Sequence, residues 1–182
     1  MNDLCVDIGW QSLNHDGEQL CGDHVDIIEP DENSTIVVLA DGLGSGVKAS
    51  ILSTLTSKII STMMANGLSL EDCVETIAAT LPICSERKVA YSTFTIIHIV
   101  NNEEAEIIQY DNPHVILLRD GENIEYPEIE MNIGGKKIYK SRIRLNENDI
   151  FIAMSDGCPH AGVGMSLNFG WKREDIIEFM DE

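Results

Sequence analysis

The sequence predicts an α+β fold in which two consecutive helices lie on one side of a largely antiparallel sheet. The first observation is that short apolar or alternating segments, typical of strands, come before residue 41 and resume after residue 89. The second is that two helical patterns follow each other directly in between, at residues 47–66 and 69–81. This order differs from alternating βαβ units, and the strand segments are numerous enough for two sheets packed face to face.

The chain is long enough to bury a core of its own, and we expect a single domain over residues 1–182. Its 12 Lys and Arg residues against 31 Asp and Glu residues give a formal net charge of −19. Nucleic acids and anionic membranes are therefore poor partners, because a polyanion would be repelled. Two interpretations of the acidity stay open: it serves solubility alone, or some of the carboxylates bind divalent cations.

We expect a cytoplasmic protein. The first residues, MNDLCVDIGW, lack the basic start and apolar run of a signal peptide, and no apolar stretch is long enough to span a membrane. The cysteines are odd in number, scattered and never spaced as CxxC, which is typical of reduced thiols rather than of disulfides or a zinc site. They are Cys5, Cys21, Cys73, Cys84 and Cys158.

The N-terminal part is expected to hold three strands, at residues 4–10, 24–28 and 36–40. The last two flank a short polar turn and form an antiparallel hairpin. Asp23 precedes the first strand of this hairpin, and Asp41 follows the second. Because the two strands run in opposite directions, both carboxylates are expected at the same end of the sheet.

The clearest helix spans residues 47–66, where apolar residues recur at every fourth position and are expected to be buried. Gly67 is a natural stop for this helix. Ser69 caps the second helix, whose first turn carries acidic residues, and Pro82 follows its end. The apolar stripe of the first helix comprises Ile51, Leu55, Ile59 and Met63.

After the helices, the apolar period changes to that of β-strands. Turn residues separate these segments, and a glycine-rich stretch precedes the last helical pattern. Strands are expected at residues 90–100, 104–110, 115–119, 123–126, 137–144 and 149–155, and a helix at 172–180.

Residues 36–46 carry the most informative motif: a short apolar strand, Asp41, and three glycines at alternate positions before a helix. This arrangement suits either a phosphate or a metal ion. A dinucleotide-binding loop, GxGxxG, is disfavoured because Val47 occupies the position of the third glycine. An aspartate directly before the loop would also repel a pyrophosphate, and the GxxxxGK[ST] signature of a P-loop does not occur.

An apolar strand followed by Asp-Gly occurs twice in the sequence, at Asp41-Gly42 and at Asp156-Gly157. Gly22-Asp23 supplies a third carboxylate at a strand edge. A single Asp-Gly pair usually marks only a tight turn, but three such acids, two of them at matching strand ends, indicate a site. Carboxylate, carbonyl and water oxygens are ligands of Mg²⁺ or Mn²⁺ rather than of zinc.

In this order, GD at 22–23, DGLGSG at 41–46 and SDG at 155–157 resemble the motifs of the metal-dependent protein phosphatases, the PPM-type or protein phosphatase 2C superfamily. Within it, the chain is most similar to the bacterial branch of stage II sporulation protein E (SpoIIE-like). Residues 92–94 and 110–113 lie where this branch has a threonine-containing strand and a turn with proline. The resemblance covers about residues 3–182.

This resemblance implies a four-layer α/β/β/α sandwich of two mostly antiparallel sheets flanked by helices, with two Mn²⁺ or Mg²⁺ ions at one end. Asp41 and Asp23 would be the catalytic metal ligands, Asp41 bridging both ions and Asp23 binding one. The backbone carbonyl of Gly42 would bind the other ion, and Asp156 one of the two. A metal-bridging water would then attack the phosphorus of a phosphoserine or phosphothreonine.

By the same resemblance, the expected substrate is a phosphorylated protein in bacterial signalling, such as an anti-anti-sigma-like regulator. In the related branch the corresponding helices are expected to move and set metal occupancy, and whether the helices at 47–81 act as such a regulatory switch stays open. The oligomeric state stays open, with a dimer among the options. The alternative function is a catalytically weak or inactive module with the same fold, which acts through partner contacts of these helices.

The sequence departs from the family pattern at its end. The family continues to a further aspartate, in an Asp-Asp-x-Thr stretch on a last strand, whereas this chain stops at Asp181-Glu182. The chain is either truncated, lacking its C-terminal strand or strands, or naturally short with weakened metal binding. We expect truncation, because the last helical pattern is open-ended.

Several other side chains are secondary candidates. His160, shortly after the last Asp-Gly pair, is a candidate proton donor to the leaving oxygen, and His24 is a candidate support for a neighbouring metal ligand. Lys48 and Arg87 are candidates for contact with the substrate phosphate. Cys158 also neighbours the expected site, but the sequence specifies no base for a cysteine mechanism.

Overall fold

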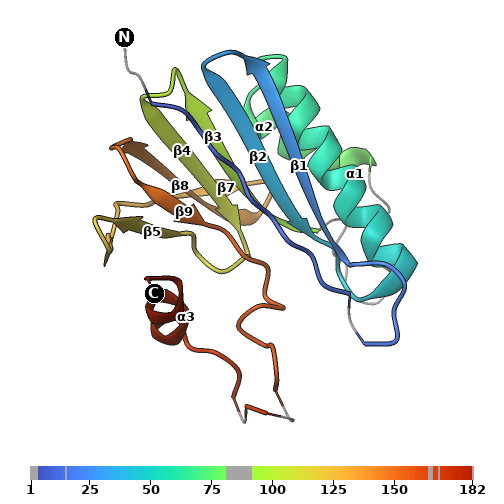
Figure 1. Ribbon diagram of the computed structural model, residues 1–182. Coiled ribbons are helices and arrows are strands. Elements are labelled where there is room, and N and C mark those ends of the chain that lie inside the picture. Colours follow the sequence, from blue (N-terminus) through green and yellow to red (C-terminus); the bar gives the residue numbers. More distant parts are fainter. Residues whose placement is uncertain (1–3, 15, 81–91, 164–165, 168, 182) are drawn as a thin grey trace.

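The computed structural model describes residues 4–14, 16–80, 92–163, 166–167 and 169–181 (Figure 1). Its helices are α1 (Gly46–Ala65), α2 (Leu70–Thr80) and α3 (Arg173–Asp181). Its strands are β1 (Asp23–Asp31), β2 (Ser34–Asp41), β3 (Thr93–Val100), β4 (Glu104–Tyr110), β5 (Ile116–Arg119), β6 (Glu122–Asn123), β7 (Ile129–Ile133), β8 (Lys136–Arg144) and β9 (Ile150–Ile152).

Two antiparallel sheets organise the fold. The larger sheet has six strands in the order β1-β2-β3-β4-β8-β7. The smaller sheet has three strands in the order β6-β5-β9. Short turns connect β1 to β2, β3 to β4 and β7 to β8, so most neighbours in the large sheet are also neighbours in sequence. The expected α+β arrangement, with two consecutive helices inserted between strands, is confirmed.

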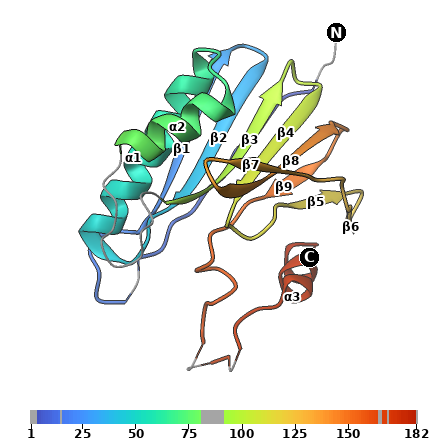
Figure 2. The same ribbon diagram turned by 180° about the vertical axis from the view of Figure 1, so that it is seen from behind.

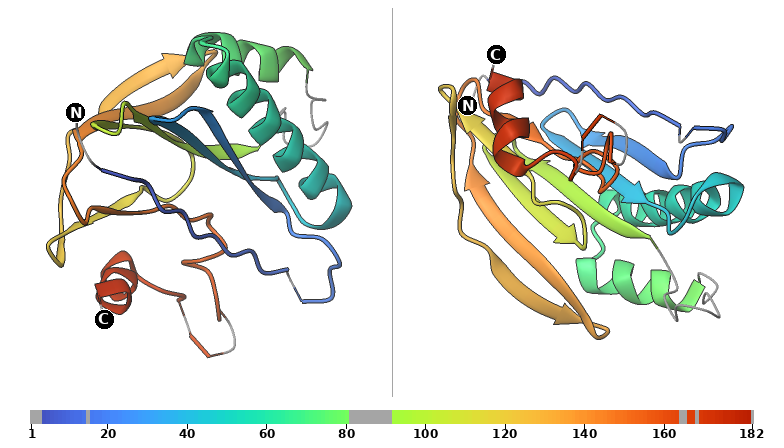
Figure 3. Two further views of the ribbon diagram at one scale, coloured as in Figure 1. Left: turned by 45° about the horizontal axis from the view of Figure 1, so that its top comes forward. Right: turned by 90° about the horizontal axis from the view of Figure 1, so that it is seen from below.

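Three apolar cores separate four layers, which Figure 3 (left) shows in order from α1 to α3. The first core lies between the large sheet and the helices α1 and α2, and includes Ile60 and Phe94. The second lies between the two sheets and includes Ile107 and Leu117. The third lies between the small sheet and α3 and includes Ile176. The layers therefore follow the α/β/β/α order implied by the sequence motifs.

Helix α1 buries small side chains rather than the whole predicted apolar stripe. Ala49 and Ser53 are fully buried, whereas Ile51 is 53% exposed and Leu55 is 43% exposed. Small residues allow the helix to lie close to the sheet, so Ile51 and Leu55 point outward, whereas Leu52 is 8% exposed. Only farther along does the stripe meet a core, where Met63 packs against residues shared with α2. Figure 2 shows that α2 lies beside α1 on the same side of the large sheet.

The ends of the first two helices agree with the predictions. Gly67, with φ of +77°, follows α1 in the left-handed conformation that glycine favours. At the start of α2, the Ser69 hydroxyl accepts the Asp72 N–H at 3.1 Å and donates to the Asp72 carboxylate at 2.7 Å. None of the helices in the described part of the chain is both long and apolar enough to cross a membrane.

The strand predictions were wrong in two ways: one predicted strand is absent, and one observed strand was not predicted. Residues 4–10 form no strand, and Val6 and Trp10 are exposed. An alternating pattern is compatible with a strand, but a strand also needs a neighbouring strand to pair with, and the pattern does not supply one. Conversely, β7 was not predicted: it lies at the edge of the large sheet, and only Ile133 of its three alternating apolar residues is buried. Of the predicted strand at 123–126, only Asn123 belongs to a strand, β6. Pro127 follows this segment and has no N–H to donate to a neighbouring strand.

Candidate metal centre

The candidate centre is built on the pairing of β1 with β2. Asp23 begins β1, Asp41 ends β2, and the antiparallel register places them opposite each other. Asp41 is also opposite Thr93, at the start of β3. Opposite residues share one face of a sheet, and even spacing along β2 puts Asp41 on the face of Val37, which packs toward the small sheet. Both carboxylates thus lie on the inner face at one end of the sandwich.

The third predicted aspartate reaches the same place from the small sheet. Asp156 lies in the turn that follows β9, and the Asp41 carboxyl is within hydrogen-bond reach of both Asp23 and Asp156. The Ser155 hydroxyl donates to Asp23 Oδ2 at 2.7 Å. The turn after β9 is therefore tied directly to the start of β1, and the three carboxyl groups gather around Asp41.

The electrostatics of this cluster are unusual. The pKa of Asp41 is raised from its ordinary value of 3.8 to about 8. Burial is the largest cause, the negative charges of Asp23 and Asp156 come next, and hydrogen bonds with the same two carboxyls add to the effect. Among the ion pairs formed by the described residues, none includes Asp41. Within the described residues, Asp41 thus lies beside two negative carboxyls and has no side-chain cation paired with it.

The glycine-rich loop brings its backbone directly against α1. A Cβ atom at Gly42 would lie 2.0 Å from the carbonyl oxygen of Ala49, so no larger residue fits there. The Gly42 N–H donates to the Gly22 carbonyl at 3.0 Å, which joins the loops that precede Asp23 and follow Asp41. These contacts fix the path of the chain beside the carboxylates.

Two polar residues at this end were not sequence-based candidates. Asn112 is 6% exposed, accepts a hydrogen bond from Thr93 Oγ1 at 2.6 Å, and donates to Thr95 Oγ1 at 3.1 Å. It thereby fastens the turn after β4 to the strand beside Asp41. Its only sequence signal was its place in the turn with proline. Glu18, for which the sequence gave no signal, accepts a hydrogen bond from Ser45 Oγ at 3.1 Å at the start of α1.

The two candidate histidines lie in different surroundings. His160 is exposed in the turn after β9, where its N–H donates to the Asp156 carbonyl at 3.2 Å. His24 is opposite Ala40 in the β1–β2 ladder. Because successive strand residues alternate between faces, the side chain of His24 lies on the other face of the sheet from Asp23. The backbone of His160 therefore lies next to that of Asp156, whereas the side chain of His24 lies on the face of the sheet away from the aspartates.

The remaining candidates are less closely placed. Lys48 is exposed in the first turn of α1, and Arg87 lies outside the described residues. Burial raises the pKa of the Cys158 thiol, which disfavours the thiolate that a nucleophilic cysteine needs. The four cysteines in the described part of the chain are free thiols.

The residue types at this centre fit hard divalent cations. Three carboxylates and the carbonyls of a glycine loop are oxygen ligands of the kind that Mg²⁺ and Mn²⁺ prefer. Within the described ranges, no group of three His, Cys, Asp or Glu side chains is arranged so that it could hold an ion.

Sequence comparison places the chain in a family. The family model for Stage II sporulation protein E (SpoIIE) matches residues 31–179, which is most of the chain. The chain belongs to the SpoIIE family. The match includes Asp41, the glycine-rich loop and Asp156. No curated protein matches the sequence.

Solved structures share the fold of this SpoIIE-family chain at low sequence identity. The PP2C phosphatase domain of SpoIIE from Bacillus subtilis, with a fragment of its regulatory domain, is 17% identical with a TM-score of 0.71, over 94% of this chain and 55% of that one. The RsbU and RsbW domains of Rv1364c from Mycobacterium tuberculosis are 14% identical with a TM-score of 0.68, over 93% and 47%. RsbX in complex with magnesium is 23% identical with a TM-score of 0.61, over 94% and 83%.

The SpoIIE-family chain spans about half the length of the first two of these structures. The likeness confirms the expected fold of two antiparallel sheets with flanking helices. It also agrees with the PPM-type resemblance of the three aspartate motifs.

Proposed function

We propose that this SpoIIE-family chain is a metal-dependent phosphoprotein phosphatase that hydrolyses phosphoserine or phosphothreonine in bacterial signalling. The observation that carries the proposal is the contact of Asp41 with both Asp23 and Asp156 at the end of β2. The shared fold with a SpoIIE phosphatase domain and with a bacterial serine phosphatase supports the same class of reaction.

In this proposal, Asp23, Asp41, Asp156 and the carbonyl of Gly42 hold two Mn²⁺ or Mg²⁺ ions. The ions, when bound, supply an acidified water for attack on phosphorus and neutralise the phosphoryl oxygens. The chain contributes the positioning: the Ser155 hydroxyl orients Asp23, and the contact of the loop with α1 fixes Gly42. The magnesium in the RsbX structure supports the choice of ion.

The proposal also includes a proton donor for the leaving group and a class of substrate. His160, exposed beside Asp156, is the proposed proton donor to the leaving serine or threonine oxygen. The proposed substrate is a phosphorylated, anti-anti-sigma-like regulator in the cytoplasm. Solved structures described as RsbU and RsbW domains and as part of the bacterial stressosome share the fold, which supports a protein substrate in a regulatory pathway.

A second candidate function is a partner-binding module with weak catalysis. One side of α1 carries exposed apolar residues at every fourth position: Val47, Ile51 and Leu55. Such a stripe favours contact with another protein. The two functions differ in whether the aspartates support turnover, so a single assay separates them.

The test is hydrolysis of p-nitrophenyl phosphate over a range of Mn²⁺ concentrations. We expect turnover that depends on Mn²⁺ and is lost in Asp41→Asn. The matched control is Asp120→Asn, because Asp120 is exposed in a turn with φ of +53°, a conformation that asparagine tolerates. Equal turnover in the wild-type chain and Asp41→Asn would overturn the phosphatase proposal, and no turnover at any Mn²⁺ concentration would favour the partner-binding module.

A further inference from the structure

A separate pocket lies between the small sheet, residues 123–128 and α3. Its volume is about 550 Å³, and the aspartates of the candidate metal centre do not line it. Much of its wall is apolar, from side chains that come from three different parts of the chain. These are Ile124, Tyr126, Met154, Pro159 and Ile176.

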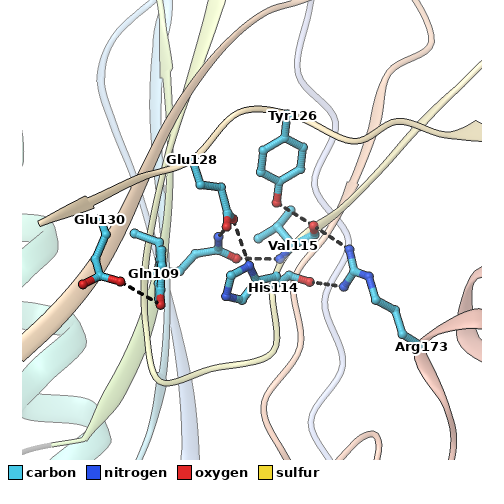
Figure 4. A network of polar contacts seen from close by, with 8 residues as sticks. Gln109, His114, Val115, Tyr126, Glu128, Glu130 and Arg173 are labelled. Atoms are coloured by element: carbon cyan, nitrogen blue, oxygen red, sulfur yellow. Dashed lines mark hydrogen bonds and ion pairs between the residues drawn. The ribbon is translucent and has the colours of Figure 1, made fainter.

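A polar network holds one wall of this pocket in place (Figure 4). Gln109 is 1% exposed; its side chain accepts the Val115 N–H at 2.6 Å and donates to Glu128 at 3.0 Å. His114 Nδ1 lies 2.9 Å from the same carboxylate oxygen of Glu128. The network ties residues 113–115, which follow β4, to the segment that leads into β7.

The other side of the pocket is anchored by α3. Arg173 donates to the His114 carbonyl at 2.5 Å and to the Val115 carbonyl at 3.1 Å. The Tyr126 hydroxyl donates to the Val115 carbonyl at 2.6 Å. Burial, followed by the charge of Glu128, raises the pKa of Tyr126 to about 12, so this hydroxyl stays a donor. These polar groups are engaged with one another, and the surface they leave for a ligand is chiefly apolar.

Two short segments of the chain lead from the pocket to the candidate metal centre. Met154 and Pro159 line it, and Asp156 lies between them in sequence. Pro113 also lines it and directly follows Asn112, which is bonded to the strand partner of Asp41. A polypeptide with its phosphate at the aspartates therefore has this pocket within reach of its neighbouring side chains.

We propose that this pocket receives one apolar side chain, such as Leu, Met or Phe, of the phosphoprotein substrate, a few residues from the phosphorylated serine or threonine. The pocket would thus select among phosphoproteins, while the aspartates act on the phosphate alone. The proposal rests on the proposed phosphatase function. A protein occupant is favoured because the pocket lies a few residues along the chain from the candidate centre and has more apolar than polar surface, which suits an apolar side chain next to a phosphorylated residue.

A bulky residue on the pocket wall gives a direct test. Asn123 lines the pocket and is exposed, and it pairs with Leu118, whose side chain faces α3. Asn123→Trp should fill the pocket without removing core contacts. Glu122→Trp is the matched control, because Glu122 is the other residue of β6, is exposed, and does not line the pocket. Glu125→Trp, also on the wall and exposed, is the second filling variant if Asn123→Trp fails to fold.

The substrates are a phosphoserine peptide with alanines on both sides and a series in which one alanine at a time is replaced by leucine. We expect leucine at one position to raise kcat/KM about tenfold or more over the alanine peptide. Asn123→Trp should abolish this gain, Glu122→Trp should retain it, and both should hydrolyse p-nitrophenyl phosphate like the wild type. The pocket proposal would be overturned if kcat/KM were the same for all peptides of the series. It would also be overturned if the higher kcat/KM of a leucine peptide persisted in both Asn123→Trp and Glu125→Trp.

Peptide binding separates this proposal from the proposed function. Fluorescence anisotropy in EDTA, with labelled peptides that carry serine in place of phosphoserine, requires neither turnover nor a phosphate site. Tighter binding of the leucine peptide than of the alanine peptide, by the wild type and Glu122→Trp but not by Asn123→Trp, supports the pocket even if p-nitrophenyl phosphate is not hydrolysed. Equal binding of both peptides by the wild type overturns it, whatever the activity.

Discussion

The chain contains aspartates in two opposite environments. Asp26 and Asp149 each face a cation: Lys58 lies 2.6 Å from Asp26, and Arg119 bonds Asp149 through two nitrogens at 2.7 Å each. Asp41 instead faces two further carboxyls. Burial acts on the carboxyl in both environments, so the difference lies in the charges of the neighbours.

This difference is visible in the pKa values. Burial would raise the pKa of Asp149, but hydrogen bonds from Arg119 and the Asn146 N–H, with the charge of Arg119, lower it below its ordinary value. The pKa of Asp41 goes the other way, to about 8. Structural aspartates bring their own counter-charge from the chain, whereas a cluster without one depends on a cation from outside. The comparison therefore assigns Asp26 and Asp149 to stability and Asp41 to the proposed reaction.

The largest expected effect is on turnover. Asp41→Asn should lower kcat/KM for p-nitrophenyl phosphate by about a thousandfold or more, since it contacts both other aspartates and would hold both ions. Asp23→Asn and Asp156→Asn should each cost less, about a hundredfold, because each would hold only one ion; a residue that merely supports a ligand costs about ten- to a hundredfold. Steady-state kinetics at saturating Mn²⁺ measures this order.

Asp149→Asn is the contrasting variant for that series, and it should leave kcat near the wild-type value while lowering stability. If Asp149→Asn reduces turnover as much as Asp23→Asn does, while the chain stays folded by circular dichroism, the division between the two kinds of aspartate fails.

The next effect is on folding. Arg119→Met should lower the free energy of unfolding by about 3 kcal/mol, because it leaves the Asp149 carboxylate, with only 3% of its side chain exposed, without its cation. Urea denaturation measures the change. Arg142→Met is the matched control, since the Arg142 side chain is 66% exposed and Glu106, with 14% of its side chain exposed, keeps its pair with Lys140 at 2.9 Å. A similar loss in both variants would show that burial does not set the value of the Arg119 pair.

Much of the fold was predictable because it depends on local periodicity. The β1–β2 hairpin, α1 and the β3–β4 pair have strong patterns and were found close to the predicted bounds. The buried face of α1 was not predictable, because it depends on how closely Ala49 and Ser53 approach the sheet. The edge strand β7 was missed although its apolar residues alternate with polar ones, and only Ile133 of them is buried.

The candidate site likewise has features that were predictable from the sequence and features that were not. The meeting of Asp23 and Asp41 followed from one hairpin, so the strand directions were enough. The bond between Ser155 and Asp23 joins residues 132 positions apart, and it depends on how the two sheets pack. The pocket beside the centre depends on α3 and residues 123–128 meeting across the small sheet. Residue patterns identify such motifs but not the contacts between them.

The third effect is the dependence of stability on pH, which tests whether the surroundings of Asp41 disfavour its charged form. Between about pH 4 and pH 8 the folded chain holds a proton on Asp41 that the unfolded chain has lost, so the stability contributed by this group falls as pH rises. In EDTA, Asp41→Asn should therefore be more stable than the wild type at pH 8.5, by about 1 kcal/mol after allowing for solvent screening of a partly exposed carboxyl. At pH 5 the two should be nearly equal. Thermal melts at both pH values measure this, and a variant less stable than the wild type at pH 8.5 would contradict the repulsion.

The smallest effect concerns the other paired aspartate. Lys58→Met should cost only about 0.5–1 kcal/mol, because the Lys58 side chain is 58% exposed and water already screens its charge, and because Ser61 still donates to Asp26. Lys48→Met, an exposed lysine on the same helix, is the control for the general effect of removing a charge. Urea denaturation gives the stability, and calorimetric Mn²⁺ titration gives the affinity. A change in Mn²⁺ affinity with Lys58→Met, but not with Lys48→Met, would show that Asp26 communicates along β1 with Asp23, and the two kinds of aspartate would then be coupled rather than separate.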